Sequence, residues 1–211
     1  MRKIFALTAL FAATLALGAC LRKETTHTLY LSPDGAVVWW TLEDNVHSDA
    51  TGVDERAAEE SAYFARAAAG SGDIAGGLAA LEPTRVQTRV LRHERPFTVL
   101  TEAWFPRAES LANAIIAAFR IPGDAYLTHD EAAVTLHIHL DFRGADEDDD
   151  NATPVVNLID PLSTYRIVLT DGQFVAASGF AIDESGTIAR PVPARDDGVG
   201  QVLDLSLTWV R

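Results

Sequence analysis

The chain has 211 residues, of which 48% are hydrophobic, so it is long enough to bury the core of one folded domain. Its 30 acidic residues outnumber its 17 basic ones, which gives a formal net charge of −13 at pH 7. Such a surface repels phosphate backbones and therefore disfavours nucleic acid as a partner.

The first twenty residues have the composition of an export signal. Arg2 and Lys3 precede an uncharged, mostly apolar stretch over residues 4–17. This stretch is shorter than the roughly 20 residues that a membrane-spanning helix needs. The segment ends in Leu17, Gly18, Ala19 and Cys20. A basic start, an apolar core and small residues before the cleavage position are typical of a secretory signal peptide.

This segment resembles the signal peptide of bacterial lipoproteins, and Leu17-Gly18-Ala19-Cys20 looks like their lipobox. The resemblance implies cleavage before Cys20, a diacylglycerol on its sulfur and an acyl chain on its new amino group. It also implies attachment to a membrane of the cell envelope. Leu21 rather than Asp follows the cysteine, which by resemblance favours the outer membrane, facing periplasm or exterior, if the cell has two membranes. The alternative is an ordinary cleaved signal peptide that happens to end near a cysteine.

We therefore expect a signal peptide over residues 1–19, a lipidated tether over residues 20–27 and a single globular domain over residues 28–211. The mature chain would keep 15 of the 17 basic residues and all 30 acidic ones, for a net charge of −15. Lipid rather than a basic patch would then hold it to the membrane. Cys20 is the only cysteine, so the mature chain has no disulfide and no cysteine nucleophile. Lys23, the only lysine after the leader, falls in the expected tether, which disfavours lysine chemistry in the domain.

The domain begins with two strands, over residues 28–31 and 36–42. Ser32-Pro33-Asp34-Gly35 between them is a turn sequence, because Pro fixes φ and Gly accepts positive φ. Residues 36–42 are apolar on both faces, which predicts a central strand covered on both sides. Trp39 and Trp40 would then both belong to the core.

Three segments have helical patterns. Residues 54–69 are rich in Ala, Glu and Arg and are followed by Gly70-Ser71-Gly72. Residues 73–81 form a shorter helix that ends before Pro83. Residues 107–119 follow Pro106, a residue favoured in the first turn of a helix.

The other segments are predicted strands, mostly joined as hairpins. They cover residues 85–92 and 97–105; 126–129 and 133–142, across Asp130-Glu131; 165–169 and 173–177, across Asp171-Gly172; 180–182 and 187–189; and 202–210. Together these elements predict an α+β fold with a mostly antiparallel sheet of about 8–10 strands and two or three helices.

His137, His139 and Asp141 alternate along one predicted strand and therefore share a face. Residues two apart on a strand lie about 6.5–7 Å apart, so converging imidazoles could bind one zinc ion, with Asp141 as a further ligand. The pattern is reminiscent of metallo-β-lactamase-fold hydrolases. In that family a His follows the Asp directly, whereas here Phe142 follows and no His lies beyond His139. The alternative is a strand with polar side chains facing solvent.

Two other charged groups are candidate ligand sites. Asp146, Asp148 and Asp150 lie in an acidic run whose oxygens could attract calcium. An EF-hand loop would need Gly and Glu where Asn151 and Asn157 stand, so a solvated acidic loop is the alternative. The basic group comprises Arg85, Arg89, Arg92, His93 and Arg95. It could bind an anion, pair with the acidic run or form the wet face of a strand.

No catalytic set emerges from these motifs. We expect a lipid-anchored envelope lipoprotein with a non-catalytic binding or structural role, whose partner is another envelope protein or a glycan. The alternative is a metal-binding protein or metal-dependent hydrolase that uses His137, His139 and Asp141. Apart from the lipid on Cys20, and zinc under that alternative, no cofactor is expected.

Overall fold

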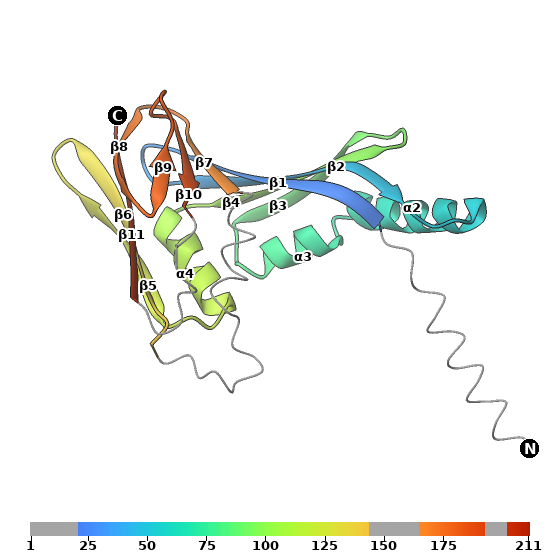
Figure 1. Cartoon of the computed structure of the whole chain (residues 1–211), viewed down its shortest axis with the longest axis horizontal. Coiled ribbons are helices and arrows are strands. Elements are labelled where there is room, and N and C mark those ends of the chain that lie inside the picture. The colour runs from blue at the N-terminus through green and yellow to red at the C-terminus, as the bar shows by residue number, and fades with distance from the viewer. Residues whose placement is uncertain (1–20, 144–164, 193–201) are drawn as a thin grey trace, which may run out of the picture.

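A computed structural model describes residues 21–143, 165–192 and 202–211 (Figure 1). The described chain forms eleven strands in two sheets and three helices, which confirms a mostly antiparallel α+β fold. The strands outnumber the expected eight to ten and divide between two sheets instead of forming one. The predicted signal peptide with Cys20 lies outside the described residues, as do Asp146, Asp148 and Asp150. In the parts that are described, no helix is both long enough and apolar enough to cross a membrane.

The larger sheet has seven strands in the order β3-β4-β2-β1-β7-β10-β9. All neighbours are antiparallel except β1 and β7, which run parallel. The strands are β1 (Leu21–Leu31), β2 (Val37–Ser48), β3 (Arg85–Arg92), β4 (Phe97–Phe105), β7 (Tyr165–Leu169), β9 (Phe180–Ile182) and β10 (Ile188–Pro191).

The smaller sheet has four antiparallel strands in the order β5-β6-β11-β8. They are β5 (Gly123–His129), β6 (Ala133–Asp141), β8 (Gln173–Ser178) and β11 (Val202–Val210). This sheet stands at one end of the larger sheet (Figure 1).

All three helices lie on one side of the larger sheet (Figure 1). They are α2 (Val53–Ala68), α3 (Asp73–Ala79) and α4 (Ala108–Ala118). The main core joins this side of the sheet, through Trp39 and Ala103, to α3, to α4 and to Leu207 of the smaller sheet. Helix α2 packs on the same side in a separate cluster, through Tyr63 and Ala67. Trp209 is fully buried there, and its indole N–H donates to the carbonyl of Pro33 at 3.1 Å.

The expected tether over residues 20–27 is wrong for every residue that the structure describes, because β1 already begins at Leu21 and pairs with Ser48 of β2. The charged sequence after Cys20 suggested a solvated segment. In the structure, however, Lys23 forms an ion pair with Glu43, which is only 4% exposed. The hydroxyl of Tyr63 donates to the other oxygen of the same carboxylate at 3.0 Å. The only lysine beyond the leader is therefore part of the folded domain.

The predicted burial of β2 is right on one face only. The strand is central, and Val37, Trp39 and Thr41 are buried on the side of the helices. Val38 and Trp40 are only partly buried and point to the opposite side. The helices lie on the other side of the sheet (Figure 1). A strand that is apolar on both faces thus lies in a sheet with helices on one side.

The Asp171-Gly172 turn does not form the predicted hairpin. It connects β7, which pairs with β1 and β10, to β8, which pairs with β11 in the other sheet. Gly172 has φ +92°, and a Cβ there would lie 2.0 Å from the carbonyl oxygen of Val210. The turn sequence was recognised correctly, but burial of Leu169 and Phe174 in the shared core decides which strands pair. The predicted β3–β4, β5–β6 and β9–β10 hairpins are confirmed.

Candidate binding site

The predicted metal ligands His137, His139 and Asp141 share the outer face of β6, as expected from strand alternation. The register places Asp124 of β5 and Asp204 of β11 opposite His139 on either side. This face carries a depression between the strands, lined mainly by polar side chains.

Each of the three predicted ligands is engaged by a different neighbour. His139 Nδ1 lies 2.7 Å from Asp204 Oδ1, and this hydrogen bond raises the pKa of His139 above its usual value. His137 stacks on Tyr126 with ring centroids 4.8 Å apart, and its Nε2 lies 3.0 Å from the hydroxyl of Thr128.

Asp141 accepts hydrogen bonds from the side chain of Arg143 at 2.9 and 2.7 Å. These bonds hold the pKa of Asp141 well below its usual value. Across the described ranges, no three His, Cys, Asp or Glu side chains are grouped so that they could hold one metal ion. The polar side chains on this face of β6 therefore contact their neighbours in pairs, as on a solvated sheet surface. They are not arranged as three ligands around one metal ion.

The predicted basic group does not form a single cluster. Arg89 binds Glu102 of β4 at 2.6 Å, whereas Arg95 binds Glu60 of α2 at 3.0 Å. The guanidinium of Arg85 lies 4.8 Å from the ring centroid of Trp104. The arginines therefore support three separate contacts rather than one anion site.

The outer side of the larger sheet carries a group of apolar side chains that we call the aromatic face. The register of β1, β2 and β4 places its members on that side. Tyr30 and Trp40 meet edge to face, with ring centroids 4.9 Å apart. The aromatic face comprises Tyr30, Val38, Trp40, Leu42, Leu100 and Trp104.

Polar side chains surround this face. Arg85, Gln87 and Arg89 border it on β3, and Arg166 borders it on β7, where it donates to the hydroxyl of Thr28 at 2.8 Å. Glu102 lies within the face, but it is only 5% exposed and is paired with Arg89. The result is an apolar centre with a rim that contains three arginines.

Sequence reasoning missed this face because it assigned Val38, Trp40 and Leu42 to a buried layer. A signal was present in β3, where Arg85, Gln87 and Arg89 alternate with Val86, Thr88 and Val90. A polar row on an edge strand indicates that this side of the sheet meets water. The neighbouring strands place side chains on the same side, where Trp40 and Trp104 are partly exposed and Leu100 is only 5% exposed.

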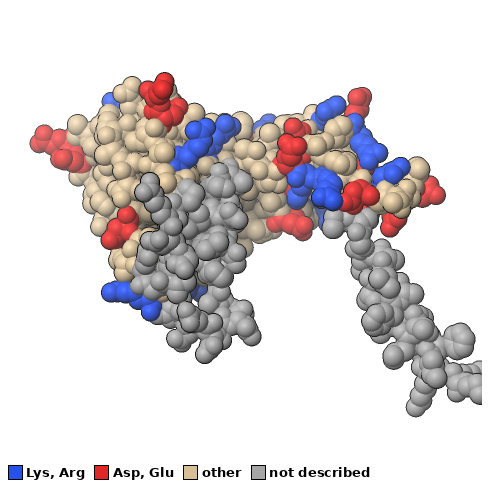
Figure 2. All heavy atoms as spheres, in the orientation of Figure 1, with Lys and Arg blue, Asp and Glu red and all other residues tan. Residues whose placement is uncertain are grey.

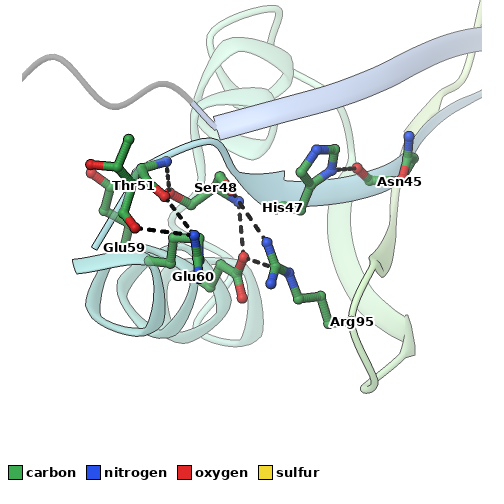
Figure 3. Close-up of polar contacts among 9 residues, drawn as sticks. Asn45, His47, Ser48, Thr51, Glu59, Glu60 and Arg95 are labelled. Atoms are coloured by element: carbon green, nitrogen blue, oxygen red, sulfur yellow. Dashed lines mark hydrogen bonds and ion pairs between the residues drawn. The ribbon is translucent and has the colours of Figure 1, made fainter. Parts of the chain in front are cut away.

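At the other end of β2, a cluster of Ser48, Glu59, Glu60 and Arg95 fastens three elements together (Figure 3). The backbone N–H of Ser48 donates to Glu60 at 2.9 Å, and its hydroxyl donates to Glu59 at 2.5 Å. Arg95 binds both Glu60, at 3.0 Å, and the carbonyl of Ser48, at 3.3 Å. His47, the neighbour of Ser48, contacts the carbonyl of Asn45 at 2.7 Å. The contacts of Ser48 therefore join the end of β2 to α2 and to the β3–β4 loop.

No family model matches this chain, and no curated protein matches it. Among solved structures, the folded domain of the LppM protein of Mycobacterium tuberculosis is similar over 89% of each chain. The two sequences are 10% identical and the TM-score is 0.39. A likeness at this level carries no argument about fold or function.

Proposed function

We propose that this chain is a lipid-anchored lipoprotein of the cell envelope whose folded domain binds another protein and catalyses no reaction. Leu17-Gly18-Ala19-Cys20 supports the anchor, because it combines a lipobox-like sequence with the chain's only cysteine. The aromatic face carries the proposed binding role.

The composition of the aromatic face matches that of a protein interface. Such interfaces have an apolar centre and a polar rim, and Trp, Tyr and Arg dominate their binding energy. Trp40, Trp104 and Tyr30 supply the centre, and Arg85, Arg89 and Arg166 belong to the rim. Because the chain as a whole is strongly acidic, this face differs in charge from most of the surface. It therefore suits a partner with an apolar patch bordered by acidic groups.

The aromatic face is also preorganised. Its side chains stand on central strands whose opposite side forms the main core, as Trp39 and Ala103 show. A rigid surface loses little conformational entropy on binding, so more of the contact energy appears as affinity.

Site-specific photo-cross-linking in the native cells tests this role. A photoreactive residue in place of Gln87 lies on the rim, and one in place of Thr128 on the outer face of the smaller sheet is the matched control. We expect one discrete adduct from position 87, reduced when Trp40→Ala and Trp104→Ala are introduced together. Equal labelling from both positions, or labelling from position 128 alone, would rule out the aromatic face. A protease-resistant adduct would identify a glycan instead.

A further inference from the structure

The larger sheet begins next to the proposed lipid. β1 starts at Leu21, the residue after Cys20, and consecutive Cα atoms are only about 3.8 Å apart. A lipid on Cys20 therefore joins the folded domain without an intervening tether. Because Leu21 pairs with Ser48, the end of the sheet that carries both residues must lie close to the bilayer.

We call this region the Leu21 end. It contains the start of β1, the end of β2, the start of α2, the end of β3 and the loop between β3 and β4. The contacts of Arg95 with Glu60 and Ser48 fix that loop to β2 and α2 (Figure 3). The ring of His93 in the loop also lies 5.4 Å from that of Phe64 in α2. The loop therefore has a defined position relative to Leu21.

The surface chemistry of the Leu21 end suits a membrane interface. Two apolar side chains are strongly exposed there, Val53 at 72% and Leu91 at 53%. Leu91 and Arg92 stand at the end of β3, and Arg92 is exposed together with His93 and Arg95 of the loop that follows. Figure 2 shows basic side chains over this part of the molecule, with acidic ones among them. Exposed apolar residues combined with Arg are favoured at headgroups, where each basic residue contributes about 1 kcal/mol near anionic lipid.

Acidic groups offset this charge. Asp49 binds Arg22 at 2.8 Å, Glu94 lies within the loop, and Asp54 and Glu55 lie in the first turn of α2. The covalent lipid and the exposed apolar side chains therefore supply the attraction, and the arginines orient the contact. The rest of the acidic surface is repelled by anionic headgroups.

We propose that the end of β3, with Leu91 and Arg92, and the β3–β4 loop lie against the phospholipid headgroups and set the orientation of the domain. This inference rests on the proposed lipid anchor. The opposite end of the sheet then projects from the membrane, since the ten residue steps from Leu21 to Leu31 span about 33 Å. The aromatic face would then point parallel to the membrane surface, where a partner in the same compartment can reach it.

Fluorescence quenching in vesicles tests this orientation. The full-length lipidated protein, with Leu91→Cys labelled by a fluorophore, is reconstituted in phosphatidylethanolamine–phosphatidylglycerol vesicles that contain brominated lipid. Arg92→Cys gives a second position, at the last residue of β3. Asp171→Cys is the control, because Asp171 follows Leu169, the strand partner of Leu31. A lipidated Cys20 thiol does not react, so each variant carries one label.

We expect quenching several-fold stronger at positions 91 and 92 than at position 171. Equal quenching at the three positions, or stronger quenching at 171, would overturn the orientation while leaving the anchor intact. Mass spectrometry of the same samples separates the two proposals, since a bare Cys20 would overturn both.

Discussion

At the residue scale, three buried glutamates determine much of the electrostatics of the larger sheet. Glu43, Glu60 and Glu102 are 4%, 8% and 5% exposed, and each is paired with a basic side chain. Their partners Lys23, Arg95 and Arg89 are more exposed. A carboxylate left buried without its cation is costly, so these pairs hold the ends and edge of the sheet in one arrangement.

The pair of Lys23 and Glu43 gives a direct test of where the fold begins. We expect Lys23→Met to lower the free energy of unfolding by about 1–3 kcal/mol, because Glu43 stays buried with only the Tyr63 hydroxyl bound. Urea unfolding of the purified protein measures this change. Arg22→Met is the matched control, and we expect a change below about 0.5 kcal/mol, because Arg22 forms an exposed pair. If Lys23→Met left the free energy of unfolding unchanged, the result would contradict the ion pair and favour residues 21–27 as a tether.

His139 gives a pH dependence with a defined sign. Its pKa is raised in the folded protein, first by the hydrogen bond to Asp204 and then by the charges of neighbouring carboxylates. The ion pair therefore contributes stability below the unfolded pKa, about 6.5, and this contribution is lost as pH rises through the folded value. NMR titration should show the His139 pKa above that of His139 in the Asp204→Asn variant. Identical titration curves would remove Asp204 as the cause.

At the element scale, β2 has two faces that sequence alone does not distinguish. Trp39 is 6% exposed in the main core, whereas Trp40 belongs to the aromatic face. We expect Trp39→Ala to cost about 3–5 kcal/mol of unfolding free energy and Trp40→Ala about 1–2 kcal/mol. Chemical denaturation of the two variants measures the difference. Equal losses would mean that both faces are covered, as the sequence first suggested.

Gly172 tests the turn between the two sheets, and Gly76 in α3 serves as a comparison. Gly172→Ala should destabilise the protein, since the position has φ +92° and the new Cβ would meet the carbonyl of Val210. Gly76→Ala in α3 meets nothing within 4 Å and should stabilise by about 0.5–1 kcal/mol. Thermal unfolding of both variants should therefore shift in opposite directions. A Gly172→Ala variant as stable as the parent protein would contradict the geometry of the β7–β8 connection.

The elements that the sequence predicted well are those with local signals. The β3–β4 hairpin, α4 and β11 follow from alternation, a Pro at the helix start and turn residues close in sequence. Pairings between distant segments could not be predicted this way. β1 pairs in parallel with β7, and β8 pairs in the other sheet. Both pairings depend on the core that the two sheets share, and a short stretch of sequence carries no information about that core.

At the scale of the whole molecule, the candidate site also depends on contacts between segments that are distant in the sequence. Strand alternation correctly placed His137, His139 and Asp141 on one face. It did not identify Asp204 as a partner of His139, since the two residues are 65 positions apart in the sequence. The aromatic face was missed for a related reason: the number of layers that pack on a sheet is a property of the assembled fold.

The proposed anchor and the start of β1 together define one account of the molecule: a rigid sheet attached to the membrane at one end, with a binding face along its side. The measurement that tests it most directly is intact-mass and N-terminal peptide analysis of the protein purified from its native membranes. The account predicts a chain that starts at Cys20 and carries a thioether-linked diacylglycerol, usually with an amide-linked acyl chain. A chain that retains residues 1–19, or an unmodified thiol at Cys20, would contradict it.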